Sequence, residues 1–318
     1  MHTKLGFIGA GKQAREHAQA AVAQGAEIAH IANSDGKLNE NIDKLTRLSQ
    51  TPGLVTKVSI AADLLKDDEL DAIIVSLPWD VTCHMMEALM ASPLPMLIEK
   101  PIILDHQFFT SREGQENKWA GFNRRFYDTV ELLKSHVKTK GMKSAEVTIS
   151  EHIQAIVKRH SQKIVPHLWE THCAHLLDLM TYVFGRLSLK SVYRHTDEEF
   201  TSVTALFERN GTPVTLHVNN NDPSPVGIRA RFPSGETWVL SPIEQLTIFK
   251  GVEVIPADKD NPIRKYVGRI ASSFWEKGQY KPGIYEQMDA FLQGRMDNAA
   301  TVADAVQLHS DIKALRGG

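Results

Sequence analysis

The segment Gly9-Ala-Gly11-Lys-Gln-Ala14 has the residue types and the spacing that a dinucleotide-binding turn requires. Gly9 permits a tight turn, Gly11 lets the backbone approach a pyrophosphate, and Ala14 lets the following helix pack closely on the preceding strand. The free N–H groups and the positive end of that helix would then face the phosphates. Because other strand–helix turns share this pattern, its meaning depends on the elements around it.

Strands and helices alternate around this turn, which is typical of a parallel, doubly wound sheet. A short apolar strand precedes Gly9, and apolar residues at helical spacing follow Gly11 as far as Gly25. The run 71–78 is almost continuously apolar, as expected for a strand buried on both faces. The further strands expected are 27–32, 56–59, 71–78 and 95–101, and the helices between them are 38–49, 61–65 and 81–90.

The second half of the chain has a different rhythm, in which strands outnumber helices. A strand is expected at 143–150, and a long apolar helix, Leu168–Phe184, follows Pro166. Asn210-Gly211, between two strand-like runs, predicts a hairpin. The later strands expected are 189–195, 201–208, 213–219, 226–232 and 237–240, with closing helices at 283–292 and 302–315 and loops at 110–117, 219–225 and 257–262.

These patterns predict an α/β protein with two domains. Residues 1–121 are expected to form an N-terminal Rossmann domain with a doubly wound parallel sheet. Residues 122–318 are expected to form a C-terminal α+β domain for substrate binding and oligomerisation, with an open, mostly antiparallel sheet. The last helices of the chain can pack back on the first domain.

Length and composition limit the class of protein. The 318 residues, 42% of them hydrophobic, are enough for two domains of ordinary size. With 36 basic and 38 acidic residues, the chain lacks the basic excess of a nucleic-acid-binding protein. It has no signal-peptide pattern and no membrane-length apolar run, and Cys83 and Cys173 cannot form a disulfide framework. We therefore expect a cytoplasmic protein that binds neither nucleic acid nor membrane.

Four segments, taken together, resemble one family of oxidoreductases. They are Gly9-Ala-Gly11-Lys-Gln-Ala14, Glu99-Lys100-Pro101, Gly121-Phe-Asn-Arg-Arg-Phe126 and His175-Leu-Leu-Asp178. Glu-Lys-Pro at the end of the fifth strand, followed by Gly-Phe-Asn-Arg-Arg-Phe, is the most specific part. Over nearly its whole length the chain is similar to the family of glucose–fructose oxidoreductase, inositol dehydrogenase and rhizopine-catabolism proteins (Gfo/Idh/MocA).

This resemblance implies an NAD(P)-dependent oxidoreductase. Hydride would move between the nicotinamide and a carbinol carbon of a sugar, an inositol or a nucleotide-linked sugar. The resemblance implies that Lys100 hydrogen-bonds the reacting hydroxyl and lowers its pKa or relays its proton, and that His175 is the general base. Asp178, at i+3 from His175, would orient it or bind substrate. Further substrate contacts are expected from Thr171, His172, Arg124 and Lys158.

One departure from the family concerns the histidine. The family often has an aspartate four residues before it, where this chain has Thr171, and a glycine two residues before it, where this chain has Cys173. A threonine cannot stabilise an imidazolium as a carboxylate does. Glu170 and His172 are neighbouring substitutes, but on an ideal helix they point elsewhere. The details of the proton relay are therefore open.

The resemblance and the strand ends also define the expected cofactor site. An acidic residue at the end of the second strand favours NAD, because it binds the ribose 2′-hydroxyl. Here that position is Asn33, followed by Ser34; Lys12, Lys37 and Arg15 favour NADP, and Asp35 argues for NAD. We place NAD slightly ahead of NADP. The cofactor-binding residues expected are Gly9, Gly11, Lys12, Gln13, Asn33, Ser34, Ser76, Leu77, Pro78, Trp79, His84, Glu99 and Lys100.

Two other groups of residues have alternative interpretations. Zinc sites use His and Cys on helices, but His172 and His175 at i+3 without a zincin motif are poor ligand evidence, so no metal is expected. Lys158-Arg159-His160 and Lys163 read as a basic loop before the long helix. A solvated loop is the ordinary interpretation of that segment, and a phosphate or carboxylate contact is the alternative.

Two rival functions follow from the departures at Thr171 and Cys173 and from the fold. The chain could sense NAD(P) and a sugar without turnover, as a regulator. It could also be a hydrolase or lyase in which a bound cofactor oxidises the sugar only transiently. A homodimer or homotetramer is expected in any of these cases, because the second domain's sheet has one face left uncovered.

Overall fold

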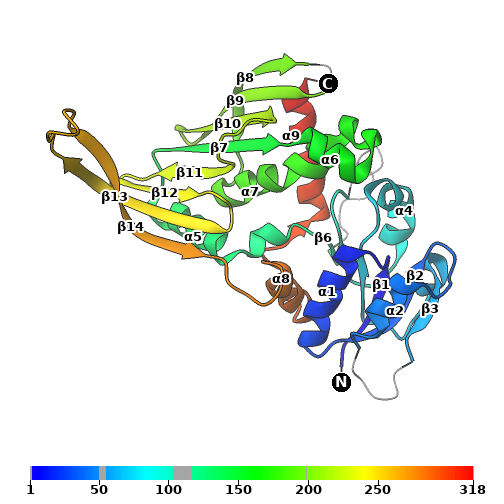
Figure 1. Ribbon diagram of the computed structural model, residues 1–318. Helices are drawn as coiled ribbons and strands as arrows, with labels where there is room; N and C mark the ends of the chain where they lie inside the picture. The colour runs from blue at the N-terminus through cyan, green and yellow to red at the C-terminus, as the bar shows by residue number, and fades with distance from the viewer. Residues whose placement is uncertain (1, 50–54, 103–115, 198, 318) are drawn as a thin grey trace. The chain divides into compact units, whose positions relative to one another are not determined.

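The computed structural model describes residues 2–49, 55–102, 116–197 and 199–317 (Figure 1). The loop predicted at 110–117 lies outside these residues except for its last two positions. The chain divides into two compact units. Unit 1 comprises Met1–Phe126 and Gly278–Ile312, and unit 2 comprises Tyr127–Lys277 and Lys313–Gly318.

Unit 1 contains a seven-stranded sheet in the order β15-β6-β5-β4-β1-β2-β3. All neighbouring strands are parallel except β15 and β6. The order 3-2-1-4-5-6 is that of a Rossmann fold, which confirms the predicted class of this sheet. The strands are β1 (Lys4–Ile8), β2 (Glu27–Asn33), β3 (Lys57–Ile60), β4 (Ala72–Val75), β5 (Met96–Ile98), β6 (Lys118–Ala120) and β15 (Ala300–Thr301).

Small side chains allow the first helix to pack tightly on this sheet. Ala14, Ala18 and Ala21 are fully buried, and they share one core cluster with Ile284 and Met288 of α8. This alanine face brings the helix backbone close to the strands, as the sequence pattern predicted. The helices of this part of the chain are α1 (Lys12–Ala23), α2 (Glu40–Thr46), α3 (Ala61–Leu64), α4 (Trp79–Ala91), α8 (Ile284–Leu292) and α9 (Val302–Arg316).

Unit 2 contains an eight-stranded sheet in the order β14-β13-β12-β11-β7-β10-β9-β8. Only β7 and β10 are parallel, so the prediction of a mostly antiparallel second sheet is also confirmed. The strands are β7 (Ser144–Glu151), β8 (Ser188–Thr196), β9 (Thr201–Arg209), β10 (Thr212–Asn220), β11 (Gly227–Arg231), β12 (Glu236–Leu240), β13 (Gln245–Ile255) and β14 (Lys265–Trp275).

One face of this second sheet packs on helices. Val214, Leu216 and Val218 of β10 are buried, and the residues between them are more exposed, which is the alternation of a half-buried strand. The covering helices are α5 (Asp128–Lys140) and α7 (Ala174–Phe184), which contact each other and the sheet. A third helix, α6 (Ile153–His160), follows β7.

Several elements differ from the sequence predictions. The basic segment 158–160, predicted as a loop, is the last turn of α6, and Lys163 lies in the 3₁₀ segment Gln162–His167. The predicted helix Leu168–Phe184 instead begins with a π-helical turn, Trp169–Cys173, before α7. Strands β6, β13, β14 and β15 and helix α5 were not predicted, although the 257–262 segment between β13 and β14 is a loop as expected.

The hairpin predicted at Asn210-Gly211 joins β9 and β10, and both residues have positive φ, 49° and 81°. None of the helices in the described part of the chain has the length and apolar character that a bilayer crossing requires.

Candidate functional site

Gly9 forms the turn between β1 and α1, and no other residue fits there. Its φ is +99°, and its N–H donates to the Ala32 carbonyl at 2.9 Å. A Cβ at this position would lie 2.1 Å from the Ser76 carbonyl oxygen. The turn therefore brings the ends of β1, β2 and β4 together, and it requires a residue without a side chain.

Gly11 is the N-cap of α1 and has a different role in the same turn. Its φ of −71° suits any residue, and a Cβ built on it would meet nothing within 4 Å. No side chain caps α1, so its first N–H groups are not satisfied by a described side chain. An open backbone, unfilled space and a positive helix end fit the pyrophosphate of a dinucleotide.

The structure brings most of the predicted cofactor residues to one edge of the unit 1 sheet. Because β1, β2, β4 and β5 are parallel neighbours, the residues that follow them share the carboxyl edge of the sheet. That edge carries Asn33 and Ser34 after β2, the segment 76–79 after β4, and Glu99 and Lys100 after β5. His84 lies further along α4, where it is exposed and its Nδ1 is 2.6 Å from the Asp80 carbonyl.

The loop after β2 uses Asn33 to hold its own shape. Asn33 Oδ1 accepts a hydrogen bond from the Gly36 N–H at 2.7 Å, and Nδ2 donates to the Lys37 carbonyl at 2.9 Å. Ser34 and Asp35 are exposed at the tip of this loop. The exposed groups available to a ribose are therefore chiefly those of Ser34 and Asp35, whereas the Asn33 amide already has two partners.

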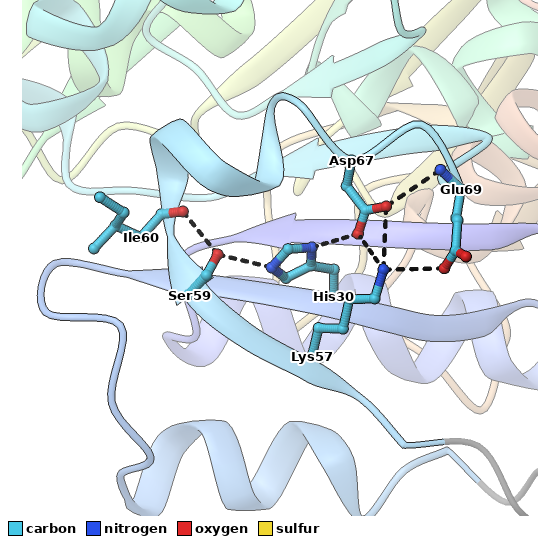
Figure 2. Close-up of polar contacts among 6 residues, drawn as sticks. All are labelled: His30, Lys57, Ser59, Ile60, Asp67 and Glu69. Atoms are coloured by element: carbon cyan, nitrogen blue, oxygen red, sulfur yellow. Dashed lines mark hydrogen bonds and ion pairs between the residues drawn. The ribbon is translucent and has the colours of Figure 1, made fainter.

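A polar network around the buried His30 of β2 was not predicted from the sequence. Figure 2 shows His30 between Ser59 and Asp67, each 2.7 Å from one ring nitrogen. Lys57 joins Asp67 to Glu69, at 3.2 and 3.0 Å. The order Ser–His–Asp resembles a hydrolytic triad, but the Ser59 hydroxyl donates to the Ile60 carbonyl at 2.8 Å. This network therefore joins β2, β3 and the segment after α3.

Glu99 is held by the helix that begins at the glycine turn. Its Oε1 accepts hydrogen bonds from His17 Nε2 at 2.7 Å and from Gln13 Nε2 at 3.0 Å. Burial of the Glu99 carboxyl opposes its ionisation, but the His17 hydrogen bond, the His17 and Lys100 charges and the Gln13 hydrogen bond outweigh it and lower the pKa. The carboxylate predicted to contact cofactor thus faces α1.

Neighbours of the glycine turn make further contacts. Gln13 Oε1 accepts from Lys281 Nζ at 2.8 Å, so both ends of its predicted cofactor-binding amide already have protein partners. The Lys12 side chain is 86% exposed. Lys100 is half-buried, directly beyond β5, and the Lys100–Pro101 peptide bond is cis.

His17, the partner of Glu99, is not among the site residues predicted from the sequence. It is fully buried on the apolar face that also carries Ala14, Ala18 and Ala21. Helical spacing alone shows a histidine on that face. A histidine that shares a helix face with alanines at i, i+3 and i+4 spacing can be predicted to be buried, but this spacing does not identify Glu99 as its hydrogen-bond partner.

The residues predicted around the histidine lie in unit 2. His175 is the second residue of α7 and is partly exposed, and Asp178 is buried one turn later. The Thr171 hydroxyl donates to the His167 carbonyl at 2.6 Å and lies 2.9 Å from His172 Nδ1. Because Thr171 is in a π-helical turn, the four-residue spacing to His175 does not have its α-helical meaning.

Glu170 and Cys173 of the π turn are both buried. Glu170 Oε1 accepts from Arg316 at 3.3 Å. Burial and the Glu151 and Glu170 charges raise the pKa of the Cys173 thiol well above its usual value. The thiol is therefore neutral and unsuited to metal binding or nucleophilic attack. Within the described ranges, no group of three or more His, Cys, Asp and Glu side chains could hold a metal ion.

The two remaining substrate candidates lie in different units. Lys158 is exposed in the last turn of α6, in unit 2. Arg124 is half-buried in the 3₁₀ turn Asn123–Phe126, in unit 1. The adjacent Arg125 is buried and donates to Asp304 at 3.1 Å. Lys100, Arg124 and the cofactor candidates thus belong to unit 1, whereas the histidine segment and Lys158 belong to unit 2.

Comparison with known proteins defines the class. Residues 3–117 match the profile of the oxidoreductase family with an NAD-binding Rossmann fold, Gfo/Idh/MocA. This match confirms the resemblance inferred from the sequence motifs, and it shows that residues 3–117 are similar to the NAD-binding Rossmann fold of that family. A search of curated proteins gives no match.

Solved structures share the fold over the whole chain. UDP-N-acetylglucosamine 3-dehydrogenase from Acidithiobacillus ferrooxidans is 17% identical, with a TM-score of 0.69, covering 100% of this chain and 97% of that one. A myo-inositol dehydrogenase from Corynebacterium glutamicum is 14% identical, with a TM-score of 0.68 and coverages of 99% and 96%. A levoglucosan dehydrogenase solved with NADH is 13% identical, with a TM-score of 0.72 and coverages of 99% and 96%.

Proposed function

We propose that this oxidoreductase transfers hydride between a nicotinamide and a CH–OH carbon of a sugar, an inositol or a nucleotide-linked sugar. The observation that carries the proposal is the carboxyl edge of the unit 1 sheet. It holds the open Gly9–Gly11 turn and, two strands away in the order β1-β4-β5, the half-buried Lys100. The dehydrogenases that share the fold act on substrates of this class, as their names state.

The cofactor would be held by the glycine turn, the start of α1 and the segment after β4. When bound, a nicotinamide dinucleotide supplies a hydride acceptor or donor. The Lys100 ammonium would donate a hydrogen bond to the substrate hydroxyl oxygen and stabilise the negative charge that develops when its proton leaves. The His175 imidazole would take up that proton, and Asp178 would orient the ring or bind substrate.

We propose NAD ahead of NADP as the cofactor. Support comes from the exposed Asp35 carboxylate in the loop after β2, which would repel a 2′-phosphate. Binding of both reduced cofactors to the protein, followed by nicotinamide fluorescence, tests this choice. Tighter binding of NADPH than of NADH would reverse it.

A substrate panel tests the reaction class. Myo-inositol, levoglucosan and UDP-N-acetylglucosamine are incubated with the enzyme and NAD or NADP, and the absorbance of the reduced nicotinamide is followed. Net reduction supports the proposal. Binding of a sugar without turnover would favour the regulator, and cleavage of the sugar without net reduction would favour the hydrolase or lyase.

Lys100→Ala tests the proposed proton handling. We expect turnover to fall about 10²- to 10⁴-fold, because the hydroxyl loses its charged donor. The Kd for NADH should stay within about twofold, because the glycine turn is untouched. Lys66→Ala, at an exposed lysine of the same unit, is the matched control. Unchanged turnover in Lys100→Ala would remove Lys100 from the mechanism.

We also propose a homodimer or homotetramer in the cytoplasm, with a small molecule as substrate. Support comes from the β13–β14 hairpin, which extends beyond the other strands of its sheet in Figure 1. Val254, Tyr266 and Ile270 of this hairpin are 50%, 68% and 60% exposed. A two-stranded hairpin with exposed apolar side chains gains stability when another surface covers it.

A further inference from the structure

We propose that His17 is a positioning residue for Lys100: by holding the Glu99 carboxylate against α1, it fixes the end of β5 from which Lys100 extends. The inference rests on the proposed function, in which Lys100 acts on the substrate. It assigns a role to a residue that does not itself contact substrate or the reacting atoms.

The first argument is that the imidazole of His17 has one hydrogen-bond partner among the described residues, Glu99. The side chain is fully buried, and Nε2 donates to Glu99 Oε1 at 2.7 Å. Nδ1 is also buried, and it has no hydrogen-bond partner among the described residues. A buried polar ring with an unsatisfied nitrogen is costly in an apolar helix face. Among the described residues, its contact with Glu99 is therefore the only polar interaction that accounts for a histidine at this position.

The second argument is that Glu99 is held through its side chain, its packing and its main chain. Its side chain is only 13% exposed and also accepts from Gln13. Behind it, a Cβ at Gly121 would lie 3.2 Å from Glu99 Cδ, so the carboxylate packs against bare backbone. Its N–H donates to the Val75 carbonyl at 2.8 Å and prolongs the β4–β5 ladder.

Lys100 is the first residue beyond this fixed position. The side chain and the main chain of Glu99 are both held, and Lys100 follows by one peptide bond, with its positive charge attracted to the carboxylate. Loss of the His17 donor would leave Glu99 with one side-chain hydrogen bond, from Gln13. A small displacement of a group that contacts the reacting atoms lowers the rate strongly.

The third argument concerns α1, which begins at the Gly9–Gly11 turn. Gln13 and His17 lie on its first two turns, and both donate to Glu99. The helix whose N-terminus would meet the pyrophosphate therefore also holds the strand end that carries Lys100. Cofactor and lysine would be positioned by one rigid element.

The test compares two variants of the same size. His17→Gln keeps an N–H donor at about the place of Nε2, and His17→Met removes it. We expect kcat to fall about 10- to 100-fold in His17→Met and to recover largely in His17→Gln. KM for the fastest substrate of the panel and the Kd for NADH should change less than about threefold. Equal losses of kcat in both variants would overturn the proposal.

His30→Met is the matched control. His30 is also a buried histidine at 2.7 Å from a carboxylate in unit 1, and Asp67 likewise keeps a lysine nearby (Figure 2). The His30→Met substitution removes the same kind of histidine–carboxylate pair, at a place that does not carry Lys100. We expect His30→Met to lower the melting temperature about as much as His17→Met and to leave kcat within about twofold. A loss of kcat in His30→Met as large as in His17→Met would overturn the proposal.

A second readout needs no turnover. Lysines are reductively methylated with ¹³C, and the Lys100 resonance is identified by its absence in Lys100→Arg. We expect this resonance and its pH titration to change in His17→Met and to match wild type in His17→Gln and His30→Met. An unchanged Lys100 resonance in His17→Met would overturn the positioning role. Failure of the whole substrate panel would overturn only the proposed function, since this measurement is independent of it.

Discussion

The two glycines of the β1–α1 turn show how one motif combines two physical requirements. Gly9 has a positive φ and a carbonyl oxygen where a Cβ would be, so its requirement lies in the fold. Gly11 has ordinary backbone angles and open space, so nothing in the described fold requires it to be glycine. A requirement for glycine at position 11 must come from a ligand that occupies that space. Substitutions at Gly9 and Gly11 should therefore affect different properties, stability and ligand binding.

We expect Gly9→Ala to lower the free energy of unfolding by about 1–3 kcal/mol, because a side chain is strained at this φ and meets the Ser76 carbonyl. Gly11→Ala should change it by less than about 0.5 kcal/mol, since its Cβ meets nothing. NADH affinity should nevertheless fall about tenfold in Gly11→Ala, because the methyl group occupies the phosphate approach. Chemical denaturation and nicotinamide fluorescence measure the two quantities. NADH affinity unchanged in Gly11→Ala would place the pyrophosphate elsewhere.

Positions that depend on the backbone alone could be predicted from the sequence. Gly9, Gly11 and the position of Lys100 at a strand end could be placed from short-range pattern. The direction of the Glu99 side chain could not, because it depends on His17, which is 82 residues away in the chain. Likewise, a helix of uniform period was expected at Thr171, and only the structure shows the π-helical turn there.

At the scale of elements, alternation of strands and helices was sufficient to predict most of the unit 1 sheet. Strand β6 was missed because it is only three residues long and begins with a lysine. Strands β13 and β14 were missed because their outer halves are exposed on both faces and so lack an apolar–polar alternation. Apolar–polar alternation in a sequence reveals strands that are buried on one face. Strands without such burial cannot be predicted from it.

The lysine of β6 is buried and fully occupied with hydrogen bonds, so we expect it to affect stability. Lys118 is fully buried, and its Nζ donates to the Ser92 and Leu94 carbonyls at 3.0 and 2.8 Å and to Asn117 Oδ1 at 2.7 Å. It therefore ties β6 to the chain segment before β5. Burial lowers the pKa of Lys118 to about 8.

The sign of the pH effect follows from this lowered pKa. Between the folded pKa and the ordinary value of about 10.4, the unfolded chain binds more protons, so stability rises with pH there. We expect wild type to gain about 3 kcal/mol of unfolding free energy relative to Lys118→Met as the pH rises through this range. Denaturant titrations at several pH values measure the difference, with Lys66→Met as the exposed control. A difference that is constant with pH would contradict a lowered pKa.

At the scale of the whole molecule, the surface of unit 2 predicts self-association. The outer halves of β13 and β14 expose apolar side chains next to one another, as in the cross-strand pair Val254 and Tyr266. Apolar surface of this kind marks interaction sites on soluble proteins. A second copy of the chain offers the same hairpin and could cover it symmetrically.

We expect wild type to be a dimer or tetramer, and the double variant Val254→Lys with Tyr266→Lys to be a folded monomer, because charges would be buried in the interface. Light scattering after gel filtration measures the mass. Val55→Lys, at a site 84% exposed in unit 1, is the control and should keep the wild-type mass. A wild-type monomer, or a double variant with wild-type mass, would exclude the hairpin as the contact.

The sequence by itself predicted the Rossmann class of unit 1, the glycine turn between β1 and α1, the mostly antiparallel second sheet and the resemblance to a family of oxidoreductases. These properties follow from short-range periodicity, from glycine geometry and from motifs a few residues long. Only the tertiary structure decided which buried polar groups pair: His17 with Glu99, His30 with Asp67, and Lys118 with the carbonyls before β5. The physical reason is that a buried polar side chain takes its partner from whatever the fold places within about 3 Å, at any separation in sequence.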